Sequence, residues 1–177
     1  MYFKVNKTKF KNVFIIYPKN YNDSRGSFVK IFSKNIFNKF KLQSSLKEVY
    51  ITHSKKNVIR GMHYQISPFK LVKIIKVIRG EILDVILCLD KKSKDYGESY
   101  SVKLSDVNNK ILYIPEDYAH GFRVLSKEAI VCYLTSNSYN FKSDKCISYK
   151  SFGFDWKCRN PILSKRDLKG KKFEKNN

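Results

Sequence analysis

The sequence lacks the features of membrane-spanning, exported and disulfide-rich proteins. No apolar run in its 177 residues approaches the roughly 20 residues that a helix needs to cross a bilayer, so we expect no membrane partner. The N-terminal residues MYFKVNK contain neither the apolar core nor the small-residue cleavage site of a signal peptide, which predicts a cytoplasmic protein. The four cysteines are widely spaced and form no CxxC pair, which predicts reduced thiols and neither a zinc site nor a disulfide framework.

Acidic residues are also few. The chain has 15 Asp and Glu against 36 Lys and Arg, a formal net charge of +21. Such a balance is typical of proteins that bind nucleic acids. The lysines are scattered along the chain among many Asn, Ile and Tyr, which favours a drift in composition with lysines on solvated faces. We therefore expect no nucleic-acid partner, although a basic pocket for a small diphosphate is compatible with the charge.

Helical patterns are almost absent, and the middle of the chain has the pattern of β-strands. Apolar, β-branched runs at residues 73–79 and 82–89 flank Gly80, which predicts two strands joined as a hairpin. Further strands are expected at residues 99–104, 110–114 and 129–134. Only residues 33–40 favour a helix, and it is short.

Many short strands with turn residues between them predict an all-β sandwich or jelly roll. The sequence has no internal repeat and no low-complexity linker. We therefore expect a single domain over residues 1–177, in which residues 169–177 form a charged, frayed tail.

His63 is one of only three histidines and stands between two cations, Arg60 and Lys73. With Tyr133 and Asp167 it supplies an imidazole, an ammonium, a phenol and a carboxylate, the groups needed to move a proton next to a carbonyl. Each has an ordinary explanation when taken alone. A lone histidine is usually structural, Lys73 is one lysine among many, Tyr133 sits in an apolar strand, and Asp167 resembles a surface charge. Only their combination indicates a site.

His63 and His120 could instead meet as metal ligands in a β-barrel. Metal-binding barrels of this kind need two histidines and a carboxylate close in sequence, and the position two residues after His63 is Gln65, a poor ligand. We therefore expect no metal.

Five segments carry a resemblance to a known family. Residues 58–65, VIRGMHYQ, resemble V-L-R-G-L-H-[FY]-Q, and residues 80–85, GEILDV, resemble G-E-V-F-D-V. Residues 114–122, IPEDYAHGF, resemble I-P-E-G-F-A-H-G-F. Near the two ends of the chain, DSRG at residues 23–26 resembles D-E-R-G, and PILS at residues 161–164 with Asp167 resembles L-S-x-K-D. These are motifs of the dTDP-4-dehydrorhamnose 3,5-epimerases. Their order and spacing hold over nearly the whole chain.

The resemblance implies a cupin-type jelly roll (a double-stranded β-helix) with an N-terminal strand extension and short helices. It also implies a homodimer that needs no cofactor and no metal. Family members invert C3 and C5 of nucleotide-linked 4-keto-6-deoxyhexoses, on the route to rhamnose and related surface sugars. The ketone at C4 acidifies both C–H bonds because the carbanion is delocalised as an enolate. A base removes the proton from one face, and an acid returns one from the other.

Carried over by motif, His63 is the base and Asp167 is its partner. Lys73 matches the lysine that stabilises the enolate, and Tyr133 matches the tyrosine that returns the proton. The substrate-binding positions implied in the same way are Arg25, Arg60, His120, Asp144 and Arg166, together with Glu48 and Tyr50 from the segment that reads the base.

Departures from the family pattern gather around substrate recognition. Glu48-Val49-Tyr50 stands where the family has Q-D-N, and Lys30 replaces a glutamate. The nucleotide carrier and the number of inverted carbons therefore stay open. A C3-only epimerase of a dTDP- or CDP-linked sugar and a cupin that only binds a nucleotide sugar are alternatives. A ketoisomerase of the related barrel family would carry a second histidine in place of Gln65.

Overall fold

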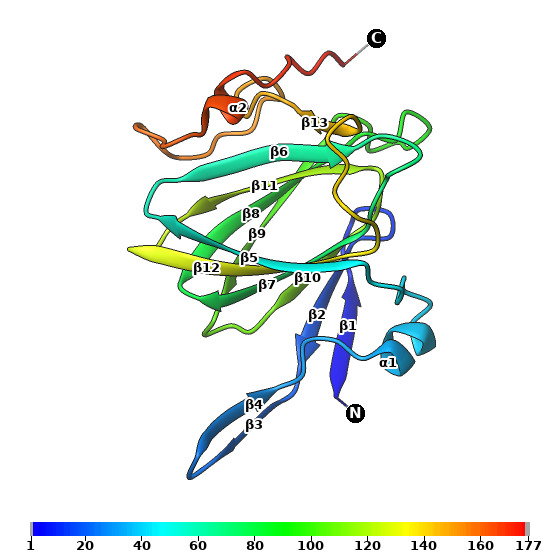
Figure 1. Cartoon of the computed structure of the whole chain (residues 1–177), viewed down its shortest axis with the longest axis vertical. Coiled ribbons are helices and arrows are strands. Elements are labelled where there is room, and N and C mark those ends of the chain that lie inside the picture. Colours follow the sequence, from blue (N-terminus) through cyan, green and yellow to red (C-terminus); the bar gives the residue numbers. More distant parts are fainter. Residues whose placement is uncertain (1, 176–177) are drawn as a thin grey trace.

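The computed structural model describes residues 2–175, whose regular secondary structure consists almost entirely of antiparallel β-strands (Figure 1). One sheet has the order β1 (Phe3–Lys7), β2 (Phe14–Pro18), β10 (Ile111–Ile114), β7 (Lys73–Arg79), β12 (Glu128–Thr135) and β5 (Glu48–Lys55). The other has the order β13 (Asp144–Cys146), β6 (Ile59–Gln65), β11 (Tyr118–Val124), β8 (Glu81–Cys88) and β9 (Ser99–Ser105). The remaining elements are the hairpin β3 (Asn20–Asp23) and β4 (Gly26–Val29) and the short helices α1 (Lys34–Lys39) and α2 (Lys165–Leu168).

The two large sheets pack face to face, and part of the outer face of each is also covered. On β8, Ile82 and Ile86 point into the core between the sheets, whereas Val85 and Leu87 pack outside against Trp156. Successive side chains of a strand point to opposite faces, so a strand buried on both faces has a continuous apolar run. This double burial explains why the strands in the middle of the chain are so evident in the sequence.

The link between β7 and β8 differs from the expected hairpin. β7 pairs with β10 and β12, whereas β8 pairs with β11 and β9, so Gly80 carries the chain from one sheet to the other. Gly80 has a φ of +84°, and a Cβ there would lie 2.2 Å from the carbonyl oxygen of Glu128. The hairpin prediction was wrong because two apolar runs around a glycine look alike whether the strands pair or pack across a core.

The other expected elements of the middle of the chain are confirmed as β9, β10, β12 and α1. The sequence pattern missed β6 and β11, because Arg60, His63 and His120 interrupt their apolar character. The pattern also gave no sign of β5, β13, α2 or the N-terminal strands, although the family resemblance implied an N-terminal strand extension and short helices. Among residues 2–175, no helix is both long and apolar enough to cross a membrane.

The C-terminal segment is docked as far as it is described, contrary to the frayed tail expected there. The Lys171 amide donates to the Cys146 carbonyl at 2.9 Å, and the Phe173 amide donates to Ser151 Oγ at 2.8 Å. Phe173 also packs against the outer core that contains Trp156. The tail was expected to fray because its composition is highly charged, and these backbone contacts leave no sign in the sequence. Residues 176–177 of the expected tail lie outside the described residues.

We expect Gly80→Ala to lower the free energy of unfolding by about 2 kcal/mol or more, because alanine is strained at this φ and its Cβ would press on the Glu128 carbonyl. Gly153 is the matched control, since its φ is +75° and no atom lies within 4 Å of the Cβ position. Gly153→Ala should cost only about 1 kcal/mol. Urea denaturation of both variants measures the difference, and equal losses would show that the contact at Gly80 is unimportant.

Candidate active site

A cavity of about 490 Å³ opens between the two sheets. Its walls come from β5, β7 and β12 of one sheet and from β6, β11 and β13 of the other. The residues predicted from the sequence that line it are His63, Lys73, Tyr133, Arg60, His120, Asp144, Arg166, Glu48 and Tyr50. Segments far apart in the sequence thus supply one concave polar surface, the usual setting of a small-molecule site.

A close approach of β6 and β11 sets the position of the two histidines. His63 lies opposite His120 in the pairing of these strands, and the register shifts just beyond, between His120 and Phe122. A Cβ on Gly61 would lie 2.5 Å from the Cα of Gly121, so only glycine allows the two backbones to come this close. The glycines of the two motifs therefore bring both imidazoles to the cavity wall.

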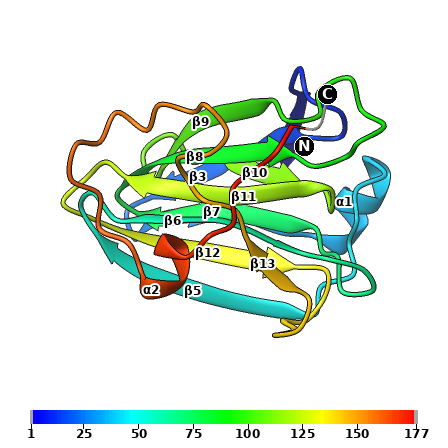
Figure 2. The same cartoon turned by 90° about the horizontal axis from the view of Figure 1, so that it is seen from above.

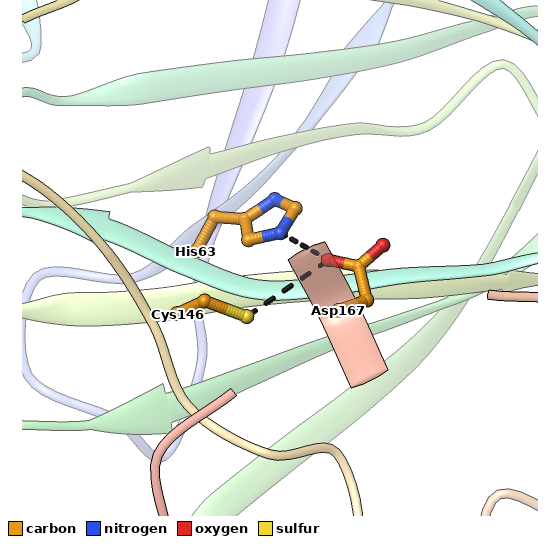
Figure 3. Close-up of side chains that lie close together, drawn as sticks. All are labelled: His63, Cys146 and Asp167. Atoms are coloured by element: carbon orange, nitrogen blue, oxygen red, sulfur yellow. Dashed lines mark hydrogen bonds and ion pairs between the residues drawn. The ribbon is translucent and has the colours of Figure 1, made fainter. Parts of the chain in front are cut away.

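His63 is held by Asp167, which lies beside it on α2 (Figure 3). His63 Nε2 lies 2.5 Å from Asp167 Oδ1, and Ser164 Oγ donates to the other carboxylate oxygen at 2.8 Å. Asp167 is only 3% exposed, so it is far from the surface charge that it resembles in the sequence. Figure 2 shows α2 and β13 beside β6, which is why the bond can form.

The protonation of this pair suits a base. Burial lowers the pKa of His63, and the hydrogen bond to Asp167 only partly offsets this. Burial pushes the pKa of Asp167 upward, but the hydrogen bonds from His63 and Ser164, together with the charges of His63 and Arg166, outweigh it and leave the carboxyl pKa below its ordinary value. An ionised carboxylate only accepts hydrogen bonds, so Nε2 carries the proton of the neutral imidazole. Nδ1 is then the atom that can take a proton.

Lys73 and Tyr133 come from the opposite sheet. Tyr133 pairs with Ile75 across β12 and β7, and Lys73 is two residues from Ile75, so both side chains lie on the face toward the other sheet. Lys73 Nζ donates to the His63 carbonyl oxygen at 2.9 Å. Burial lowers the pKa of Lys73 to about 8, so the ammonium form persists at neutral pH. An ammonium therefore bridges the gap between the wall with the imidazole and the wall with the phenol.

Tyr133 is a protonated phenol in an apolar setting. Burial raises its pKa far above the ordinary value, and neighbouring Tyr50 adds to the effect. The rings of Tyr50 and Tyr133 stack with centroids 4.8 Å apart and planes 12° from parallel. The ring of His120 meets Tyr133 edge-on at 6.0 Å. These contacts fix the plane of the Tyr133 ring. They also make Tyr50 part of the cavity wall.

The remaining polar groups place both positive and negative charges around the cavity. Arg166 pairs with Asp144 at 2.5 Å, and Arg60 Nε donates to Ser54 Oγ at 2.9 Å. Glu48 accepts a hydrogen bond from the Tyr139 amide at 2.9 Å. Two guanidinium groups near one cavity suit an anionic ligand, because planar forks of N–H donors match phosphate oxygens.

A second buried pair was missed by the sequence reasoning. His120 Nε2 lies 2.9 Å from Asp84 Oδ2, and both side chains are almost fully buried. Burial raises the pKa of Asp84, while His120 and Lys73 act in the opposite direction. The sequence did contain a sign of this pair, since Asp84 is a single carboxylate inside the apolar run of β8. This pair orients the His120 ring toward the cavity.

Gln65 connects two loops around the cavity. Its amide nitrogen donates to the carbonyl oxygens of Phe69 and Ser138 at 2.7 and 3.1 Å. Its amide oxygen accepts from the Asn140 amide at 2.7 Å. The side chain is therefore engaged by backbone groups on both sides.

Arg25 lies outside the cavity. It sits at the turn of the β3–β4 hairpin, which projects from the body of the molecule as an arm (Figure 1). Its side chain is 88% exposed and pairs with Asp23 at 2.6 Å. Within one chain, the structure does not bring Arg25 to the other predicted site residues.

Comparisons with known proteins identify the family of this chain. Residues 7–175 match the family described as dTDP-4-dehydrorhamnose 3,5-epimerase. A protein of that name from Shigella flexneri is 39% identical over 173 residues, which covers 96% of this chain and 95% of that protein. The chain belongs to this family. The family predicted from the sequence motifs is thereby confirmed.

Solved structures of family members share the fold. A dTDP-4-dehydrorhamnose 3,5-epimerase from Sulfolobus tokodaii has a TM-score of 0.91 at 34% identity and covers 97% of this chain and 96% of its own. A dTDP-6-deoxy-D-glucose-3,5-epimerase from Legionella pneumophila, in complex with dTDP-4-keto-L-rhamnose, has a TM-score of 0.92 at 30% identity and covers 96% and 92%. The expected cupin-type jelly roll is confirmed, and the chain is an epimerase, an enzyme of the isomerase class.

We expect Asp167→Asn to lower the pKa of His63 further, because the variant removes the carboxylate that favours the imidazolium form. Proton NMR titration of the three histidines measures it, with exposed His53 as the internal reference. An unchanged His63 titration would contradict the electrostatic role given to Asp167.

Proposed function

We propose that this protein inverts C3 and C5 of a nucleotide-linked 4-keto-6-deoxyhexose, without a cofactor, in the synthesis of deoxysugars for surface polysaccharides. One observation carries the proposal. His63 and Tyr133 line facing walls of a single cavity, and the Lys73 ammonium lies between them. An imidazole and a phenol on facing walls, with an ammonium between them, are what an inversion through an enolate requires.

In the proposed reaction, His63 Nδ1 removes the proton from the carbon next to the ketone. The electron pair of the broken C–H bond moves into the enolate, whose oxygen receives a hydrogen bond from the Lys73 ammonium. A donor of this kind contributes about 3 kcal/mol to transition-state stability. The imidazolium that forms is stabilised by the Asp167 carboxylate, which is already bonded to Nε2.

Tyr133 then delivers its phenol proton to the opposite face of the same carbon, which inverts it. The phenol suits this step because burial holds it protonated, as its raised pKa indicates. After the step His63 has gained one proton and Tyr133 has lost one, and exchange with water restores both. Arg60 and Arg166 are the proposed partners of the diphosphate, and Glu48 and Tyr50 contact the nucleotide side of the substrate.

We also infer that the active unit is a homodimer in which Arg25 enters the cavity of the second copy. The arm that carries Arg25 exposes Tyr21 and Phe28, which are 39% and 56% exposed. The edge strand β5 exposes Val49 and Ile51, at 63% and 65%. Apolar groups exposed on an arm and on an open sheet edge favour pairing with another chain.

Deuterium exchange tests the reaction. With dTDP-4-keto-6-deoxyglucose in heavy water, we expect deuterium at C3 and C5 of the product by NMR. His63→Ala should lower the exchange rate by about 10²–10⁴-fold, the usual contribution of a general base. Tyr133→Phe should still exchange at C3 while net inversion falls, because the second face loses its proton donor.

His53→Ala is the matched control, since this histidine is exposed on β5 and lies outside the cavity. Deuterium at C3 alone would identify a 3-epimerase. An absence of exchange with both the dTDP and the CDP substrate would leave a binding protein. Net inversion at the wild-type rate in Tyr133→Phe would remove the role of Tyr133.

The pH dependence of kcat/KM should have two limbs. His63 must be neutral, and its lowered pKa places the acid limb below pH 6.5. The Lys73 ammonium is lost as the pH rises through about 8, so activity should fall above that pH. Lys73→Arg keeps the cation at all these values, and its residual activity should lack the alkaline limb. An alkaline limb that stays near pH 8 in this variant would belong to another group.

A further inference from the structure

Cys146 lies beside the His63–Asp167 pair and has no part in the proposed reaction. Its Sγ is 3.9 Å from Asp167 Oδ1, and the donor atoms of the three residues all lie within 4.8 Å of one another (Figure 3). The three come from different elements. Cys146 pairs with His63 across β13 and β6, and α2 brings Asp167 to both. Sequence spacing gives no hint of the cluster, because 104 residues separate His63 from Asp167.

We propose that His63, Cys146 and Asp167 form an inhibitory site for a thiophilic divalent cation such as Zn²⁺. An imidazole nitrogen, a thiolate and a carboxylate oxygen are the donors that zinc takes in proteins. Three protein donors leave a fourth position for water or a substrate oxygen from the adjoining cavity. The set thus has the composition of an open zinc site rather than a closed structural one.

The distances allow this with small movements. Tetrahedral zinc, bound at about 2.0–2.3 Å, separates its ligand atoms by about 3.3–3.5 Å. The present separations are 2.5 Å between His63 Nε2 and Asp167 Oδ1 and 3.9 Å between Asp167 Oδ1 and Cys146 Sγ. The first must lengthen by about 0.9 Å and the second shorten by about 0.4 Å. The separation of the His63 nitrogen from Cys146 Sγ, which is at most 4.8 Å, must shorten by at most about 1.3 Å. Side-chain rotation within the cluster can supply these shifts.

Charge and hydrogen bonding set the strength of the site. Binding releases the thiol proton, so a thiolate and a carboxylate together balance the two charges of the cation. Ser164 Oγ holds the second oxygen of Asp167, as outer groups commonly do around metal ligands. The cations of Arg166 and Lys73 oppose binding, although Arg166 is paired with Asp144. The site is therefore weaker than a structural zinc site, and a chelator empties it.

Occupation of the site would switch off the base. The cation takes Nε2, whose proton moves to Nδ1, so the hydrogen bond from His63 to Asp167 is lost and the atom proposed as the base is already protonated. The carboxylate then faces the cation and no longer stabilises an imidazolium. This consequence depends on the proposed function, whereas binding itself does not.

Cobalt titration tests binding without any assay of activity. We expect Co²⁺ added to the full chain to give the thiolate charge-transfer absorption of one bound ion, and Zn²⁺ to displace it. Cys146→Ser should lose this absorption and bind Zn²⁺ at least about 10-fold more weakly. Cys158→Ser is the matched control, because Cys158 is also half-buried but lies outside the cluster. Absorption that is missing in the wild type, or kept in Cys146→Ser, would overturn the site.

Inhibition is measured separately, with each variant compared with its own metal-free rate of exchange. Zn²⁺ should inhibit the wild type and Cys158→Ser, and EDTA should restore both. Cys146→Ser should need at least about 10-fold more Zn²⁺ for the same inhibition. Cobalt binding without inhibition by Zn²⁺ would overturn the inhibitory role. If the protein is inactive but still shows the cobalt absorption, the proposed function is refuted and the proposed metal site is supported.

Discussion

The hydrogen bond between His63 and Asp167 is the interaction on which the site depends. It joins β6 to α2, two elements that share little other contact, across 104 residues of chain. A carboxylate buried to this degree is stable only with partners, so the bond and the Ser164 cap are needed to keep Asp167 inside. The docked segment after α2, with Lys171 bonded to Cys146, holds the helix in place. The C-terminal segment is in this way part of the candidate active site.

Two histidine–carboxylate pairs lie side by side, and their surroundings push them toward different tasks. Asp167 has a lowered pKa, whereas burial raises the pKa of Asp84. Groups whose environments separate their pKa values are commonly assigned separate roles in catalysis. Asp167 is suited to support a histidine that gains a proton. Asp84 lies in a fully buried position with Oδ1 unpaired among the described residues, and it is suited to orient His120.

The sequence alone predicts the parts of this protein whose signals are local. The strands β7 and β8 are evident because both of their faces are apolar, and His63, Lys73 and Tyr133 follow from a motif resemblance. The sequence alone does not predict the features that depend on which strands face one another in the folded chain. Gly80 was assigned to a hairpin because its role as a passage between sheets leaves no local mark. The cluster at Cys146 likewise exists only after β13 and α2 have docked. Arg25 also differs from the other predicted site residues, because it lies on the exposed β3–β4 arm, outside the cavity of its own chain.

The large net charge has little direct influence on the cavity. The formal charge of +21 comes mostly from lysines that are exposed on the surface, and charges beyond about 10 Å are screened at 0.1 M salt. Inside, Arg60, Arg166 and Lys73 face Glu48 and Asp144, so the local charge is nearly balanced. Burial, not net charge, gives these groups their strength, because the same desolvation that lowers the pKa of Lys73 to about 8 strengthens its attraction for an enolate oxygen. In the proposed reaction, a protein with a much less basic surface but the same buried groups would therefore make the same proton transfers.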